Sequence, residues 1–178
     1  MQVYTEQFLT CFNFTMGVEG GASTDPNDPG GTTGVGGVTL PEWNRWLLES
    51  QQAPRPLESA TLDDRKALAY AFYYEPEKLD TVPFPWAIFL FDAAYNLRFG
   101  SGAKIAQACL CEHGYYTGDI DGVLGEQSRG ALADHPEVAQ EAATARIGYH
   151  VCATLSSELD GLINRCKALK AKIVSVGL

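Results

Sequence analysis

The sequence lacks the features that mark membrane proteins, secreted proteins and disulfide-stabilised proteins. None of its apolar runs approaches the ~20 residues that a membrane-spanning helix needs. Met1 to Met16 have neither a cationic start nor a small-residue cleavage site, so we do not expect a signal peptide there. The 5 cysteines are odd in number and scattered over the chain, which indicates reduced thiols in a protein made in the cytosol.

Basic residues are also in short supply. The chain has 13 Lys and Arg against 22 Asp and Glu, a formal net charge of −9. A negative field of this kind repels phosphate backbones, so nucleic acid is not an expected partner. A length of 178 residues with 46% hydrophobic residues is typical of one compact globular domain, and we expect a monomer.

Strand-length alternation and internal repeats are absent, and apolar residues recur at helical spacing through most of the chain. Residues 86–97 are apolar nearly all round, which predicts a buried central helix. Thr39 and Thr61 each open a helix with a capping pattern. Further helices are expected over residues 3–18, 101–112, 127–133 and 134–172, the last broken near Gly148 or Ser156. The fold class is therefore all-α, with a small irregular lobe at residues 20–38, after the first helix.

Glu19 occupies an unfavourable position for a carboxylate. It falls on the last turn of the first predicted helix, where the helix macrodipole is negative. Gly20 and Gly21 follow and leave room for a ligand to approach closely. In a cleft, a carboxyl group facing helix carbonyl ends is expected to have a raised pKa, as a general acid requires. The alternative is a solvated glutamate at a helix end.

Two more groups suited to sugar chemistry follow Glu19 in the glycine-rich stretch: Asp28 and Thr33. Glycoside hydrolysis uses one carboxylic acid to protonate the leaving oxygen and a second carboxylate to activate water or stabilise the developing oxocarbenium ion. We therefore take Glu19, Asp28 and Thr33 as candidate catalytic residues.

A longer motif joins these residues: Glu19-Gly20-Gly21, Asp25-Pro26-Asn27-Asp28-Pro29-Gly30-Gly31, Thr33 and Gly37-Val38-Thr39. It resembles the opening of the glycoside hydrolase family 108 lysozymes, N-acetylmuramidases common in bacteriophages. Weaker similarity continues through Tyr73-Tyr74, residues 91–96 and residues 121–125. The chain departs from the family pattern by one extra residue between Thr33 and Thr39.

The resemblance implies a lysozyme-like helical fold and cleavage of the β-1,4 bond between N-acetylmuramic acid and N-acetylglucosamine. Residues 1–178 are then one domain. Residues 1–84 form its catalytic segment, and residues 85–178 form a helical segment that resembles the family's peptidoglycan-binding region and packs in the same core. Glu19 matches the catalytic acid, and no metal or organic cofactor is implied.

We expect Tyr73, Tyr74 and Asn96 to bind the substrate. The two tyrosines stand out because two consecutive helix positions cannot both face one core. The expected role is that of a phage endolysin, held in the host cytoplasm before release to the cell wall, or of a virion-associated lysin.

Two alternatives share this scaffold. The first is a protein that binds peptidoglycan without cutting it, as a virion part, and the net charge of −9 favours it mildly. The second is a chitinase-like hydrolase acting on another aminosugar polymer.

Other candidate sites have simpler explanations. Trp43, Trp46, Tyr115 and Tyr116 are candidates for stacking on sugars, but aromatic residues at helical spacing usually belong to a core. The cationic end, which contains Arg165, Lys167, Lys170 and Lys172, is expected to be a solvated face. Cys109, Cys111 and His113 do not have the spacing of zinc ligands, so no metal site is expected.

Overall fold

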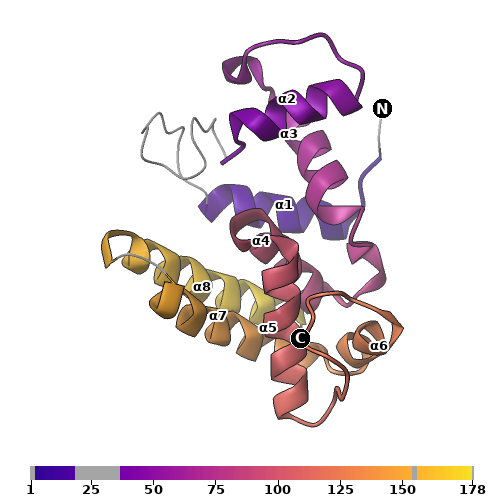
Figure 1. Ribbon diagram of the computed structural model, residues 1–178, viewed down its shortest axis with the longest axis vertical. Coiled ribbons are helices and arrows are strands. Elements are labelled where there is room, and N and C mark those ends of the chain that lie inside the picture. The colour runs from indigo at the N-terminus through magenta and orange to yellow at the C-terminus, as the bar shows by residue number, and fades with distance from the viewer. Residues whose placement is uncertain (1–2, 19–36, 154–155, 178) are drawn as a thin grey trace.

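The computed structural model describes residues 3–18, 37–153 and 156–177, and over these residues the chain is mainly helical (Figure 1). The longer helices are α1 (Glu6–Val18), α2 (Leu40–Glu49), α3 (Leu62–Ala69), α4 (Phe84–Leu97), α5 (Phe99–Glu112), α6 (Glu126–Asp134), α7 (Ala139–Ala153) and α8 (Ser156–Gly177). Short helical turns lie between them: η1 (Leu57–Ser59), η2 (Tyr70–Tyr74), η3 (Leu79–Thr81) and η4 (Pro136–Val138). The expected all-α fold class is confirmed, while most of the predicted irregular lobe lies outside the described residues.

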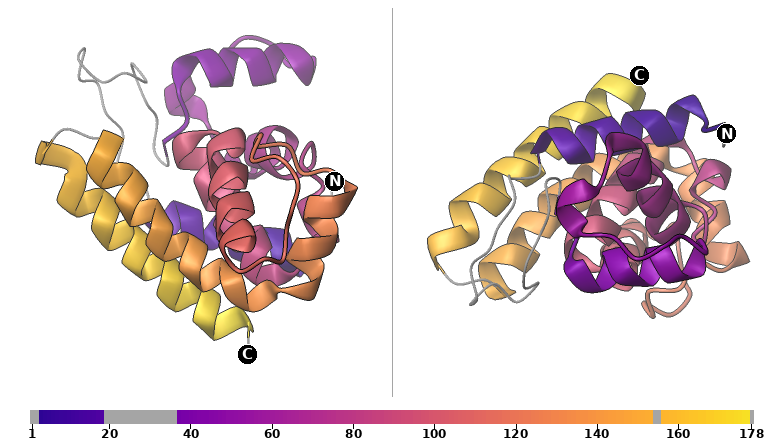
Figure 2. Two further views of the ribbon diagram at one scale, coloured as in Figure 1. Left: turned by 60° about the horizontal axis from the view of Figure 1, so that its bottom comes forward. Right: turned by 90° about the horizontal axis from the view of Figure 1, so that it is seen from above.

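Helix α4 is the centre of the molecule. Every residue from Pro85 to Ala94 is buried, as the all-round apolar run predicts. Helices α1, α5, α7 and α8 all pack against α4, and Figure 2 shows α7 and α8 lying side by side along the body. None of the helices in the described part of the chain is long and apolar enough to span a bilayer.

The described residues form two hydrophobic clusters. The larger, which we call the main core, joins residues of α1, η2, α4, α5, α6 and α7 with Leu169 and Ile173 of α8. The smaller cluster belongs to α2, α3 and the segment around them, and it contains Val38, Trp43, Trp46, Leu47, Leu57 and Leu68. We call this part of the molecule the small lobe; it lies above α1 and α4 in Figure 1.

The two helices of the small lobe begin where the sequence predicts. Thr39 accepts a hydrogen bond from the backbone N–H of Glu42, and the Glu42 carboxylate accepts one from the Thr39 N–H at 3.0 Å. Thr61 and Asp64 form the same reciprocal box at the start of α3. Such boxes satisfy backbone N–H groups that a helix start leaves unpaired.

The predicted break in the long helical region near the end of the chain lies between α7 and α8. Helix α7 ends at Ala153 and α8 begins at Ser156, so of the two predicted positions the second is correct. Gly148 lies inside α7.

Candidate functional site

A cavity of about 350 Å³ lies where the small lobe meets the end of α4. Its wall on the small-lobe side comes from Glu42 of α2 and from Phe72 and Tyr73 of η2. Its opposite wall is the end of α4 and the start of α5: Ala94, Tyr95, Asn96, Leu97, Arg98 and Phe99. The cavity therefore combines aromatic surface with a carboxylate, an amide and a guanidinium group.

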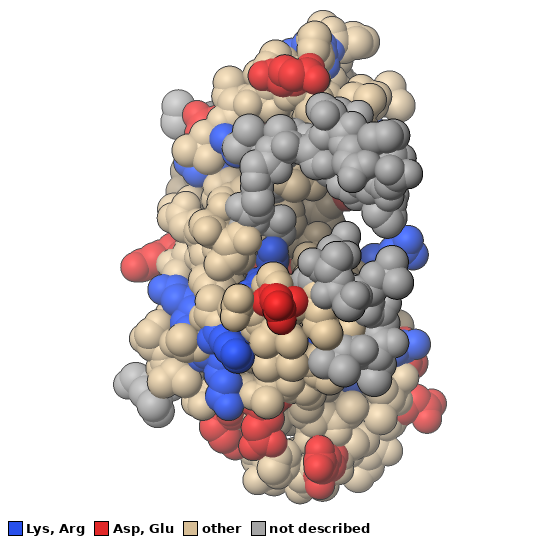
Figure 3. Space-filling model, turned by 90° about the vertical axis from the view of Figure 1, so that its left-hand side faces the viewer, with Lys and Arg blue, Asp and Glu red and all other residues tan. Residues whose placement is uncertain are grey.

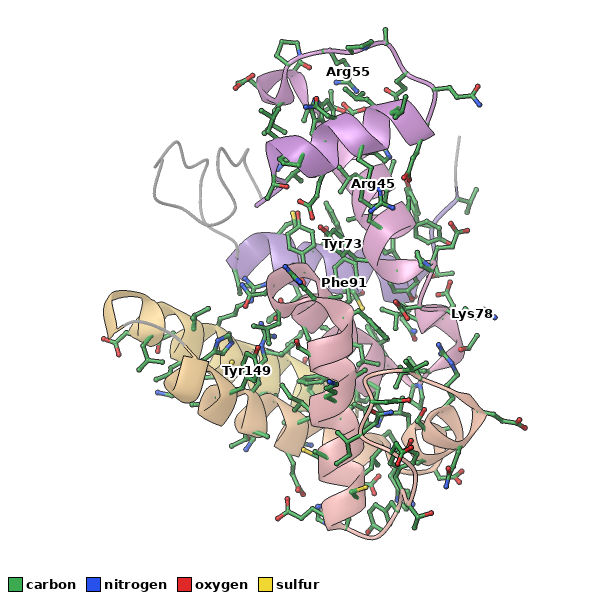
Figure 4. The ribbon with its side chains drawn as sticks, viewed as in Figure 1. Arg45, Arg55, Tyr73, Lys78, Phe91 and Tyr149 are labelled. Atoms are coloured by element: carbon green, nitrogen blue, oxygen red, sulfur yellow. The ribbon has the colours of Figure 1, made fainter. Side chains whose placement is uncertain are left out.

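Tyr73 lines the cavity and lies between the two hydrophobic clusters. It packs against both of them, and Figure 4 shows it between α2 and the helices below. Its ring lies 4.9 Å from that of Tyr95, centroid to centroid, and its hydroxyl donates a hydrogen bond to the Glu42 carboxylate. Burial and the Glu42 charge raise the pKa of Tyr73 well above its ordinary range. The phenol thus stays a hydrogen-bond donor at physiological pH.

Tyr74 points the other way. Its side chain is fully buried in the main core, and its hydroxyl donates to Asp80 at 2.7 Å. Consecutive helix positions point in different directions, so the two tyrosines diverge, and the two sides of the π-helical turn η2 face different cores. Of the two predicted substrate-binding tyrosines, only Tyr73 lines the cavity.

Asn96 connects the cavity to a buried ionic cluster. Arg146 on α7 donates from Nη2 to Asn96 Oδ1 at 2.9 Å and from Nη1 to Asp92 Oδ2 at 2.6 Å. A guanidinium group has donors only, so Asn96 must turn its oxygen to Arg146 and its NH2 group away. That NH2 group has no hydrogen-bond partner among the described residues, and Asn96 lines the cavity.

Asp92 is the anion at the centre of this cluster and is fully buried. Besides Arg146, it accepts hydrogen bonds from Arg165 on α8, at 2.6 and 3.1 Å, and from Thr15 on α1 at 3.1 Å. Burial opposes ionisation of Asp92, but the two guanidinium groups outweigh it and hold the pKa below its ordinary value. The carboxylate thereby ties three helices to α4.

His150 completes the cluster. Its Nε2 lies 3.3 Å from Nε of Arg146, a group that can only donate, so the imidazole is neutral there. Burial, followed by the charges of Arg146 and Arg165, lowers the pKa of His150.

Arg165 corrects an expectation from the sequence. The cationic end was expected to be solvated, but Arg165 is 7% exposed and is paired with Asp92. Lys167 and Lys170 are exposed, as expected, and Lys172 is half-buried. The sequence alone does not separate the buried Arg165 from the exposed lysines near it, because they differ only in the direction that each takes from α8.

The predicted catalytic residues Glu19, Asp28 and Thr33 lie outside the described residues. Helix α1 ends at Val18, and the next residue that the structure describes is Gly37, two residues before the N-cap of α2. Thr15, on the last turn of α1, bonds to the Asp92 cluster.

The other candidate aromatic residues are mostly structural. Trp43 and Trp46 stack on each other within the small lobe, with ring centroids 5.2 Å apart, and Tyr116 is buried as well. Tyr115 is 43% exposed, but one face of its ring is covered by His135, with centroids 3.5 Å apart. None of these four residues lines the cavity.

Sequence reasoning missed two polar residues of the cavity, Glu42 and Arg98. In the sequence, Glu42 was recognisable only as part of the helix-capping pattern at Thr39, a role that it has in the structure as well. Arg98 carried none, because nothing in its neighbourhood distinguishes it from a surface arginine.

Two comparisons with known proteins bear on the family and the fold of this chain. A family model described as Glycosyl hydrolase 108 matches residues 12–97, a range that includes all six predicted site residues. Among solved structures, one titled "Structure of Brucella abortus SagA" is similar with a TM-score of 0.77 and 21% sequence identity, covering 95% of this chain and 94% of that one. No curated protein matches the sequence. The family match confirms the resemblance, and the SagA match shows the shared fold.

Proposed function

We propose that this protein is a glycoside hydrolase and a muramidase, on the basis of the Glycosyl hydrolase 108 match over residues 12–97. It cleaves the β-1,4 bond between N-acetylmuramic acid and N-acetylglucosamine in peptidoglycan. The observation that carries the proposal is that the family match contains the Glu19-Gly20-Gly21 motif and also Tyr73 and Asn96, which line one cavity.

In this mechanism Glu19 protonates the leaving glycosidic oxygen. Asp28, with Thr33, holds the attacking water or stabilises the oxocarbenium ion. If Asp28 activates water, the two carboxyl groups stand ~6.5–9.5 Å apart and the product anomer is inverted, whereas ~5–5.5 Å accompanies retention. NMR of the newly formed reducing end separates the two outcomes.

The cavity supplies groups that a sugar ring needs. Tyr73 and Phe72 offer aromatic surface for the apolar face of a sugar, while the Asn96 NH2 group and the Glu42 carboxylate offer one donor and one acceptor. An acetamido group presents the complementary C=O and N–H. We propose that Tyr73 and Asn96 bind the aminosugar and that Tyr74 has a structural role.

We further propose that residues 1–178 act as one domain in a phage endolysin or a virion-associated lysin. The main core supports this, because it joins α1 from the first half of the chain to α5, α7 and α8 from the second. We propose that the protein is a monomer and uses no cofactor.

Zymography on purified sacculi with wild type and Glu19→Gln tests the catalytic proposal. We expect clearing by wild type and none by the variant, because the amide cannot donate the required proton. Mass spectrometry of the released muropeptides then identifies the bond broken and excludes amidase and transglycosylase products. Equal clearing by both proteins would remove Glu19 from the mechanism.

A non-catalytic peptidoglycan-binding protein is the second candidate, favoured by the net charge of −9. The charge is not uniform, however: on the face shown in Figure 3, Lys and Arg are interspersed with Asp and Glu. Sedimentation of the protein with sacculi, without clearing by either protein, would support this candidate.

A further inference from the structure

Helices α4 and α5 are joined by a single residue, Arg98, whose backbone has φ 81° and ψ 143°. Its N–H donates to the carbonyl of Ala94 at 3.3 Å, and its carbonyl accepts from the N–H of Ser101 at 3.2 Å. These angles suit glycine, because a Cβ atom crowds the backbone there. Any residue with a side chain is therefore strained at this position.

Close packing of the two helices fixes this conformation. A Cβ atom added to Gly102, on the first turn of α5, would lie 2.5 Å from Cβ of Ala93 on α4. The helices are in contact directly beyond the link, so the chain must turn sharply at Arg98. Glycine would meet this requirement without strain, yet the chain carries an arginine.

Arg98 is exposed and lies in the wall of the cavity. No hydrogen bond or ion pair joins its guanidinium group to another described residue. Arg45 and Arg55, by contrast, pair with Glu49 and Asp64 at 2.7 Å. The strained residue is thus also a cation whose five donors remain available at the cavity.

We propose that Arg98 is the anion-recognition residue of this cavity and binds a carboxylate of the ligand. The inference rests on the proposed function and narrows its substrate class. Peptidoglycan carries carboxylates on its peptides and, where these are removed, on the lactyl group of muramic acid. A polymer of N-acetylglucosamine carries none. Arg98 therefore favours wall glycan over neutral aminosugar polymers.

The chemistry of the group fits this task. A guanidinium group forms two parallel hydrogen bonds with one carboxylate, which gives direction as well as affinity. A chain with a net charge of −9 repels an anionic ligand at long range. A cation at the cavity attracts such a ligand at short range and so offsets this repulsion locally.

The experiment compares Arg98→Gly with Lys78→Gly in the full-length protein. Lys78 also has a positive φ, of 48°, but it does not line the cavity (Figure 4). Thermal unfolding is measured with binding of three ligands: a peptide-bearing glycan fragment, the same fragment after amidase treatment, and the neutral N-acetylglucosamine hexamer.

We expect Arg98→Gly to unfold at a higher temperature and to bind the carboxylate-bearing fragments about tenfold more weakly, with unchanged affinity for the neutral hexamer. If Arg98→Gly binds only the peptide-bearing fragment more weakly, Arg98 binds a peptide carboxylate. If it binds the amidase-treated fragment more weakly, Arg98 binds the lactyl carboxylate. Lys78→Gly should bind all three ligands like wild type. Added salt should weaken carboxylate binding in wild type and not in Arg98→Gly.

Equal binding of the carboxylate-bearing fragments by wild type and Arg98→Gly overturns the role of Arg98 and leaves the proposed function intact. If wild type binds none of the three ligands and clears no sacculi, both the proposed function and this inference are wrong. Arg98→Lys, which keeps the charge and loses the paired donors, should bind the fragments with intermediate affinity.

Discussion

Arg146 holds the side-chain amide of Asn96 in one orientation, with Nη2 donating to Oδ1 at 2.9 Å. Arg146 is itself fixed by Asp92 and is fully buried. The orientation of the Asn96 amide, a lining residue of the cavity, is thus set from the protein interior by a residue that does not line the cavity.

Asn96→Asp separates this orientation from ligand binding. The new carboxylate keeps its contact with Arg146 and balances the excess positive charge of the cluster, so the unfolding temperature should stay the same or rise. The lost donor should weaken binding of the N-acetylglucosamine hexamer about tenfold. Asn44→Asp, on the exposed face of α2, is the matched control and should bind like wild type. An unfolding temperature well below that of wild type would contradict the proposed charge balance.

Removing Arg146 should be far more costly than removing a surface cation. Arg146→Met leaves Asp92 and Asn96 with unmet hydrogen-bonding capacity in the interior and should lower the free energy of unfolding by about 3–5 kcal/mol. Lys66→Met, which breaks the peripheral pair with Asp63, should change it by less than about 1 kcal/mol. Denaturant titration measures both, and similar values for the two variants would contradict a structural role for the cluster.

The buried His150 should make the protein less stable in mild acid. Its pKa in the folded protein lies below the ordinary 6.5, so the unfolded chain takes up a proton first as pH falls. The free energy of unfolding should therefore decrease below about pH 6.5 until His150 itself becomes protonated. His150→Gln should remove this dependence. Unfolding measured at several pH values between 5 and 7.5, in both proteins, checks it.

Asp92 should produce a separate loss at lower pH. Its pKa is depressed in the folded protein, so its stabilising effect is complete above the unfolded value of 3.8 and is lost as pH falls through the folded value. Asp92→Asn should flatten the stability curve in this acidic range and leave the His150 range in place. The same titration extended to low pH tests the assignment.

Gly102 should not tolerate a methyl group. A Cβ atom there meets Ala93 at 2.5 Å, so Gly102→Ala must push α4 and α5 apart and should cost about 1–3 kcal/mol of stability. Gly130 on α6 has open space around its Cβ position, and Gly130→Ala should instead stabilise by about 0.5–1 kcal/mol. Thermal unfolding of the two variants shifts in opposite directions if the packing is as described.

Helix positions were the most predictable part of the fold. The apolar run around Trp86 and the capping boxes at Thr39 and Thr61 depend on neighbouring residues, and the structure confirms each of them. The π-helical form of η2 was not predictable, because one wide turn within a helical stretch leaves no mark on the apolar period.

The candidate site was predictable only in part. Tyr73 and Asn96 were found through short motifs, and both line the cavity. The cation that reaches Asp92 from α8 was assigned to solvent, because Arg165 stands among lysines in the sequence. Arg98 was missed because its backbone angles follow from the contact between two helices and not from local sequence.

The separate cluster of the small lobe has a consequence for native-state hydrogen exchange. Helix α2 buries its tryptophans in that cluster, whereas α4 lies in the main core. Amide protons of α2 can therefore exchange through partial opening of the small lobe, while those of α4 must wait for global unfolding. A ligand spanning the cavity would join the two parts and slow exchange most in α2.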